Sequence, residues 1–232
     1  MINSSRVHLD NFMCSAAKSM APDTRVLDAG AGIAPYRHHF KHTHYESADF
    51  CQVKKDYAKV NYVCDLAAIP VPPDSYDNVL LTQVIEHLPD PERVLRELYR
   101  VLKPDGRLWF SGPLFYPEHE QPYDFHRFTQ FGFQRLINTA GFQLEQLEWL
   151  EGYAGTVSFQ LRLARELLPR SPGAYGGGVV GATAAIGVAA MRPAFAIMAR
   201  LLAAADVKHK WTESGYCKNY CGVARKPTSG IA

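Results

Sequence analysis

The sequence lacks the features that mark several classes of protein. Its five cysteines are an odd number and none forms a CxxC pair, so neither a disulfide framework nor a zinc site is predicted. A formal net charge of only +2 provides no strongly basic face, which disfavours nucleic acid as a partner. The first residues have neither the basic start nor the apolar core of a secretory signal peptide. These absences favour a protein of the reducing cytoplasm.

Long apolar runs are also scarce. The longest, residues 173–191, is rich in glycine and alanine and is followed by Arg192 and Pro193, which argues against a membrane-spanning helix. The chain is large and apolar enough to bury a substantial core, since it has 232 residues of which 47% are hydrophobic. We therefore expect a single domain over residues 1–232, with an elaboration.

Residues 24–150 alternate apolar runs of strand length with helical patterns. This alternation is typical of crossover units that build a parallel sheet covered on both faces by helices. The candidate strands are residues 24–28, 45–49, 61–64, 77–82 and 107–111. We expect an α/β fold.

Two helices between these strands carry clear end signals. In the first, Asp90 is the expected N-cap, Pro91 the first helical residue, and residues 103–106 the turn into the next strand. In the second, Thr129 is the expected N-cap and Gly141 the C-terminal stop.

The composition changes after residue 150. Residues 155–168 and 179–205 have helical patterns around a Gly/Pro-rich loop, and residues 216–225 read as a closing strand. We interpret residues 151–213 as a helical insertion before that strand, and favour a lid packed over a binding crevice. Residues 151–210 contain seven Lys or Arg and three acids, so the insertion also suits an anionic membrane surface or a lipid-linked substrate.

The segment RVLDAGAG suggests a particular ligand. Ligands of open parallel sheets bind at the carboxyl ends of the strands, where glycines let the backbone approach them closely. Here Asp28 precedes Gly30 and Gly32, and its carboxylate repels an anion but holds a cationic amine. A dinucleotide, whose pyrophosphate needs the helix N-terminus, is therefore disfavoured.

Three further polar positions suit a nucleoside with an amino-acid tail. Asp49 ends the second strand and can accept hydrogen bonds from both ribose hydroxyls. Asp65 can accept from the adenine amino group while the Leu66 backbone completes the base contact. Gln83 ends the fourth strand over the same crevice.

At these residues the sequence resembles the Rossmann-like (class I) S-adenosylmethionine-dependent methyltransferases over residues 24–150. The motifs are VLDAGAG, ESAD, CDLAAIPVPPDSYDNVLLTQVIEHLPDP and LKPDGRLWFSGP, in the family's order. The resemblance implies a mostly parallel seven-stranded sheet and S-adenosyl-L-methionine as cofactor. It assigns cofactor contacts to Asp28, Ala29, Gly30, Gly32, Asp49, Phe50, Asp65, Leu66, Gln83 and His87. Ala34 departs from the commoner glycine, so we expect a φ below zero there.

Methyl transfer to a hydroxyl needs alignment and removal of a proton. The loop at residues 116–129, YPEHEQPYDFHRFT, is dense in polar residues, and His119 and His126 are the expected proton acceptors because histidine titrates near neutrality. The expected contacts to the acceptor are Tyr116, Tyr123, Asp124 and Arg127. For Asp124 and Arg127 the alternative is an ion pair that pins the loop. No metal is expected, even at the cluster His38, His39, His42 and His44, whose spacing matches a polar helix.

The sequence thus predicts a cytoplasmic S-adenosylmethionine-dependent methyltransferase acting on a hydroxyl or amine of a small or lipid- or glycan-linked molecule. Peripheral contact with the inner membrane face, through the insertion, belongs to the same expectation. The alternatives are a carbon methyltransferase of a quinone- or isoprenoid-like substrate, a non-catalytic regulator that binds the cofactor, and a nicotinamide enzyme.

Overall fold

The computed structural model describes residues 2–53 and 55–228. These form two compact units, one made of residues 2–8 and 151–218 and the other of residues 9–150 and 219–228. The predicted insertion at residues 151–213 lies within the first of them, which we call the helical unit. The other is called the sheet unit.

The sheet unit contains a seven-stranded sheet in the order β3-β2-β1-β4-β5-β7-β6. Strand β7 runs antiparallel to both of its neighbours, and all other pairs are parallel. The predicted fold class is confirmed. The strands are β1 Arg25–Ala29, β2 His44–Asp49, β3 Tyr62–Val63, β4 Tyr76–Thr82, β5 Leu102–Pro113, β6 Gln143–Trp149 and β7 Asn219–Arg225.

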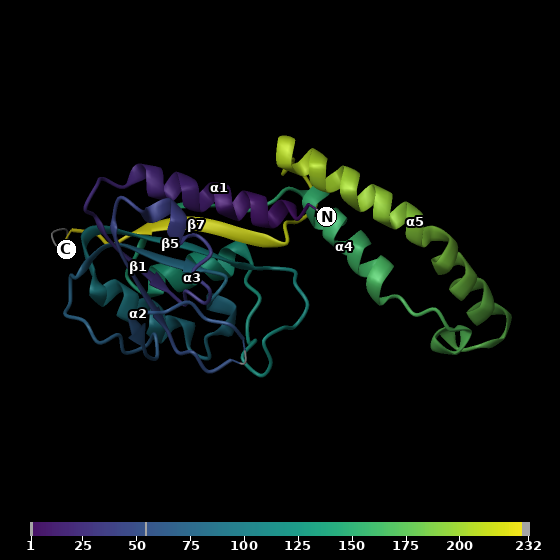
Figure 1. The fold of residues 1–232 in the computed structure, drawn as a ribbon, viewed down its shortest axis with the longest axis horizontal. Coiled ribbons are helices and arrows are strands. Elements are labelled where there is room, and N and C mark those ends of the chain that lie inside the picture. The colour runs from purple at the N-terminus through teal and green to yellow at the C-terminus, as the bar shows by residue number, and fades with distance from the viewer. Residues whose placement is uncertain (1, 54, 229–232) are drawn as a thin grey trace. The chain divides into compact units, whose positions relative to one another are not determined.

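Helices cover both faces of this sheet. Figure 1 shows α1 (Ser4–Ser19) above it, with α2 (Pro91–Val101) and α3 (Gln130–Thr139) below. Met13 and Met20 of α1 pack with Phe40 in one buried cluster, and Phe133 of α3 lies 5.5 Å from the ring of Phe110 on β5. Helix α1 and strand β6 were not among the predicted elements.

The predicted helix ends are confirmed. Asp90 caps α2 by accepting a hydrogen bond from the Arg93 N–H at 3.0 Å, and Thr129 caps α3 by accepting from the Gly132 N–H at 3.2 Å. Gly141, just past α3, has φ +95°, which glycine adopts without steric cost.

The predicted turn at residues 103–106 is wrong as a strand boundary, because β5 already begins at Leu102. Tyr76 pairs with Leu102 and Asn78 with Arg107, so the four residues form an irregularity inside the strand. Asp105 there has φ +64°. The Lys-Pro-Asp-Gly sequence does supply a local bend, but pairing with β4 resumes on both sides of it.

The expectation for Ala34 is also wrong, since its φ is +50°. Its N–H donates to the Ala31 carbonyl at 2.7 Å, and its carbonyl accepts from the Arg37 N–H at 3.2 Å. Two consecutive tight turns thus force this residue into the left-handed region, at a cost of about 1–2 kcal/mol for an L-residue.

The helical unit is built on α4 (Tyr153–Leu167) and α5 (Gly178–Lys208), which run side by side as a hairpin (Figure 1). Ser158 donates to the Ala199 carbonyl at 2.6 Å, and the fully buried Asp206 accepts from the Gly152 N–H at 2.9 Å. Helix α5 continues through Pro193. The described residues also form three 3-10 turns, η1 Arg37–Phe40, η2 Ile85–His87 and η3 Pro172–Tyr175.

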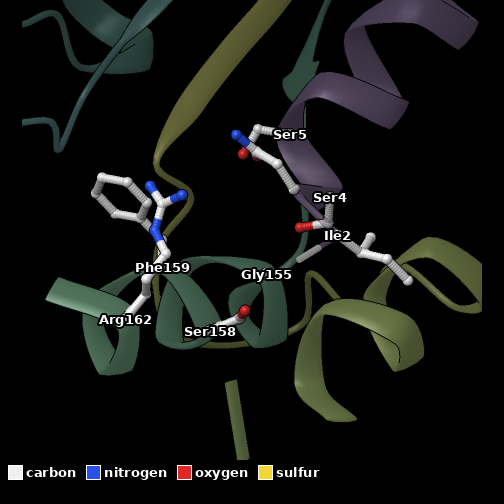
Figure 2. A pocket seen from close by; sticks show the side chains of 8 residues that line it. Ile2, Ser4, Ser5, Gly155, Ser158, Phe159 and Arg162 are labelled. Atoms are coloured by element: carbon white, nitrogen blue, oxygen red, sulfur yellow. The ribbon is translucent and has the colours of Figure 1, made fainter. Parts of the chain in front are cut away.

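Gly155 allows the close approach of α4 to the start of α1. A Cβ at this position would lie 2.3 Å from Asp206 Oδ2 and 2.6 Å from Ser4 Oγ. Figure 2 shows the small pocket at this place, whose volume of about 10 Å³ is roughly that of one water molecule. It is therefore too small for a substrate.

Candidate functional site

The sheet unit carries a cavity of about 380 Å³ at the carboxyl ends of its parallel strands. This is the edge at which ligands of open α/β sheets bind, and the volume is in the range of small-molecule sites. The structure brings together seven of the predicted cofactor residues in its lining, namely Gly30, Asp49, Phe50, Asp65, Leu66, Gln83 and His87. Asp28, Ala29 and Gly32 are not among the lining residues.

The loop after β1 is shaped by two glycines and one carboxylate. Gly30 has φ +79°, and a Cβ there would lie 2.5 Å from a methyl carbon of Val84. Gly32 donates its N–H to Asp49 Oδ2 at 2.9 Å, and Cys51 donates its N–H to Asp49 Oδ1 at 3.0 Å. Asp49 therefore ties the loop to the end of β2 while its side chain borders the cavity.

Asp28 lies behind this loop and is only 3% exposed. The hydroxyl of Tyr45 donates a hydrogen bond to its Oδ2. Burial, together with the nearby charge of Asp49, raises the pKa of Asp28 to about 6 in spite of that bond. Contact of Asp28 with a cofactor amine stays a prediction.

The predicted adenine end of the cavity is more open. Asp65 is exposed, and its Oδ1 accepts a hydrogen bond from the Ala67 N–H at 2.9 Å, while Leu66 is 6% exposed. Phe50 meets the ring of Tyr123 edge to face at 5.3 Å. The predicted acceptor residue Tyr123 thus borders the same cavity as the predicted ribose contact.

A further part of the lining comes from η2 and the segment between β4 and η2. Gln83 has φ +55°, a strained conformation for a residue other than glycine, and its Nε2 donates to Ser111 Oγ at 3.1 Å. Glu86 is 0% exposed, and among the described residues neither of its carboxylate oxygens has a hydrogen-bond partner. Burial raises the pKa of Glu86 to about 8. No candidate role was predicted for Glu86, because no local sequence pattern marks its isolation.

The loop at residues 116–129 is held by the pair Asp124–Arg127. The Arg127 guanidinium donates to both Asp124 oxygens at 2.6 and 2.8 Å, and also to the carbonyls of Tyr116 and Pro117. This ion pair lowers the pKa of Asp124 to about 2. The geometry is that of the pinning alternative, and contact of either residue with an acceptor stays a prediction.

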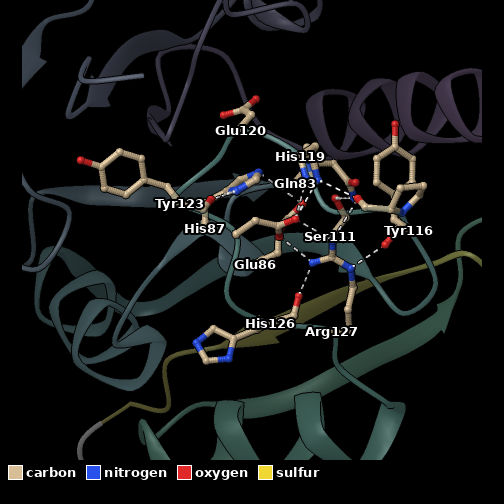
Figure 3. Close-up of polar contacts among 12 residues, drawn as sticks. Gln83, Glu86, His87, Ser111, Tyr116, His119, Glu120, Tyr123, His126 and Arg127 are labelled. Atoms are coloured by element: carbon tan, nitrogen blue, oxygen red, sulfur yellow. Dashed lines mark hydrogen bonds and ion pairs between the residues drawn. The ribbon is translucent and has the colours of Figure 1, made fainter. Parts of the chain in front are cut away.

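The two histidines named as proton acceptors have different surroundings. His119 lies against His87 and Tyr116, with ring centroids 4.6 and 5.0 Å away. His126 instead stacks on Phe128 at 5.3 Å, and Figure 3 shows its ring directed away from His119. The structure therefore does not bring these two histidines together.

The residues present fit a nucleoside that carries an amino-acid tail. Gly30 lines the cavity without a side chain of its own, and the buried Asp28 has a raised pKa that a neighbouring cation would lower. Asp49 and Asp65 lie around one cavity at the positions expected for ribose and adenine contacts. This arrangement suits S-adenosyl-L-methionine.

Comparison with known proteins agrees with this geometry. A methyltransferase domain family matches residues 27–110. A probable S-adenosylmethionine-dependent methyltransferase of Mycolicibacterium smegmatis is 34% identical over 134 residues, which cover 52% of this chain and 52% of that protein. The chain thus spans about half the length of this curated relative.

Solved structures show the same fold at low identity. The (4+2) cyclase SpnF has a TM-score of 0.60 at 19% identity, covering 95% of this chain and 82% of that chain. Phosphoethanolamine N-methyltransferase 2 of Haemonchus contortus, in complex with S-adenosyl-L-methionine, has a TM-score of 0.56 at 17% identity, covering 95% and 52%. These matches show that residues 27–110 form a methyltransferase domain and that the sheet unit has the Rossmann-like fold of S-adenosylmethionine-dependent methyltransferases.

Proposed function

We propose that this protein transfers the methyl group of S-adenosyl-L-methionine to a hydroxyl, or an amine, of a small or lipid- or glycan-linked molecule. The observation that carries the proposal is the cavity itself. Its lining combines Gly30, Asp49 and Asp65 with His87 and Tyr123. A cofactor held by the first group would present its reactive end to the second.

The reaction is an in-line displacement. The acceptor oxygen forms a bond to the methyl carbon, the carbon–sulfur bond breaks, and sulfur keeps the electron pair as a thioether. The acceptor proton goes to a base, for which His119 and His126 are our candidates. Alignment in a water-poor crevice supplies most of the acceleration, roughly 7–11 kcal/mol in well-oriented reactions.

The lipid-linked class of acceptor draws support from the helical unit. Helix α5 is long and apolar enough to cross a membrane by length and composition alone, and no membrane is part of the structure. Val179 and Val180, at its start, are 80% and 75% exposed, and Ile186 is 69% exposed. Arg165 and Arg170 are exposed nearby in sequence. Apolar residues flanked by arginines suit peripheral contact with an anionic bilayer at its inner face.

Methyl transfer itself is tested with labelled S-adenosylmethionine and parallel sets of sugar, polyprenyl-linked and quinone acceptors. A labelled product with an O–CH₃ or N–CH₃ group supports the proposal. Methylation of quinones at carbon alone would favour the carbon methyltransferase, and tight cofactor binding without turnover on any acceptor would favour the regulator. The turnover assay is needed because one protein with a similar fold is a cyclase, so the fold alone does not determine the reaction.

A further inference from the structure

We propose that Glu86, His87 and His119 form a site for one divalent transition-metal ion, such as Zn²⁺, beside the crevice. The role of the ion in activating an acceptor rests on the proposed function, whereas the site itself rests on the geometry of these three side chains. The sequence alone predicts no metal here, because the three residues come from two segments that only the fold brings together.

The three side chains converge. Their candidate ligand atoms all lie within 4.8 Å of one another, and His87 Nε2 is 3.8 Å from Glu86 Oε1. Figure 3 shows them turned toward one another, with Glu86 and His87 on η2 and His119 on the loop that follows β5. To hold an ion at the usual distance of about 2 Å, the three side chains would close around it.

Both histidines are held with Nε2 available as a ligand. His87 Nδ1 is hydrogen-bonded to the Tyr123 carbonyl, which can only accept, so the proton is on Nδ1. His119 Nδ1 lies 3.2 Å from the Pro117 carbonyl and 3.3 Å from Asp124 Oδ2, which fixes the same tautomer. Metal-binding histidines are oriented in this way by an acceptor on the second ring nitrogen.

Glu86 supplies the independent observation. Its side chain is fully buried, and neither carboxylate oxygen has a hydrogen-bond partner among the described residues. A buried carboxyl without a partner is costly, and a bound cation would satisfy it. The guanidinium of Arg127 does not act as a partner of the Glu86 carboxyl, because it is already paired with both oxygens of Asp124.

Two imidazoles and one carboxylate are donors for Zn²⁺ and similar transition metals rather than for Mg²⁺ or Ca²⁺. Three protein ligands leave a position for an acceptor oxygen. A bound hydroxyl has a lowered pKa and releases its proton to water, after which the oxygen attacks the methyl carbon and the carbon–sulfur bond breaks. With the ion bound, His119 acts as a ligand, and the role of proton acceptor considered above applies to it only in a reaction without the ion.

The test uses the full chain after treatment with a chelator. Zn²⁺ is titrated by calorimetry and Co²⁺ by its visible absorption, and we expect one ion per chain. Glu86→Gln and His119→Ala should each weaken Zn²⁺ binding at least 100-fold. His126→Ala, from the same loop, and His39→Ala, from the separate Asp10–His38–His39 group, should change it less than threefold.

The proposal is overturned if the wild type binds neither ion at one per chain, or if Glu86→Gln binds Zn²⁺ like the wild type. Adenosylhomocysteine binding shows whether each variant is folded. If adenosylhomocysteine binds and methyl transfer persists unchanged after chelation, the activating role fails and the proposed function stands. If adenosylhomocysteine does not bind the wild type, the proposed function fails while the Zn²⁺ titration still decides the site.

Discussion

The backbone N–H of Gly32 donates to Asp49 Oδ2 at 2.9 Å, so the glycine loop after β1 is anchored to the end of β2. The glycine loop and the end of β2, whose bonded residues are 17 positions apart in sequence, are thereby fixed relative to each other at the cavity. An acid expected to bind ribose also holds the loop expected to bind the methionine part.

Removing the charge of Asp28 should stabilise the protein. Its native pKa of about 6 lies above the unfolded value of 3.8. Between these values the native state binds more protons, so stability falls as pH rises, and above pH 6 the full cost is about 3 kcal/mol. Asp28→Asn should therefore unfold at higher urea concentration at pH 7.5, by about 1–3 kcal/mol, and show a flatter pH profile.

The same substitution should weaken adenosylhomocysteine binding, because a neutral amide attracts an amine less than a carboxylate does. Asp56→Asn, at an exposed position, is the control and should leave both properties unchanged. A less stable Asp28→Asn protein at pH 7.5 would contradict the account of this buried carboxyl.

Ala34→Gly should keep or raise the thermal midpoint, which is unusual for an Ala-to-Gly change. The left-handed conformation costs alanine about 1–2 kcal/mol, and glycine adopts it without this cost. Glycine also gives the unfolded chain more conformational entropy, which cancels roughly 0.5–1 kcal/mol of that gain in stability. Ala189→Gly, at an exposed position within α5, should by contrast cost about 1 kcal/mol. Equal losses in the two variants would argue against strain at Ala34.

His119→Ala should lower turnover by about 10²–10⁴-fold, while the Kd for adenosylhomocysteine stays within twofold of the wild-type value. His119 lies against His87, which lines the cavity, whereas His126 stacks on Phe128. Steady-state kinetics of His119→Ala and His126→Ala compare the two positions directly. Unchanged turnover in both would remove histidine from the proton-transfer step.

Substitution of Val179 and Val180 by glutamate should lower binding to vesicles containing anionic lipid at least tenfold. Both side chains are mostly exposed, so the double variant should fold normally. The substitutions replace two apolar side chains, expected to enter the bilayer, by charges that an anionic bilayer repels. Flotation of the vesicles measures the bound fraction. Phe131→Glu, on α3 and 70% exposed, is the matched control. Absence of wild-type binding would discard the membrane contact.

Much of the sheet unit could be predicted because its signals are local. Asp90 with Pro91 and Thr129 with Gly141 define helix ends through short-range hydrogen bonds, and the acid–glycine pattern of β1 is contained in a few residues. Strand β6 was missed because it is largely exposed, and its sequence QLEQLEW carries little apolar contrast.

The isolation of Glu86 could not be predicted. It depends on the loop at residues 116–129 folding back over η2, where Phe125 and His126 donate their N–H groups to the Glu86 carbonyl. No local pattern specifies that contact. Ala34 was mispredicted for a related reason, because two successive turns and not the residue's own preference set its φ.

The most direct test of the central claim is calorimetric titration of the protein with adenosylhomocysteine, alongside NAD and the variant Asp49→Ala. We predict one binding site for adenosylhomocysteine, no heat with NAD, and at least tenfold weaker binding in Asp49→Ala, which loses both the ribose contact and the anchor of Gly32. Failure of adenosylhomocysteine to bind the wild-type protein, or binding of NAD in its place, would contradict the account.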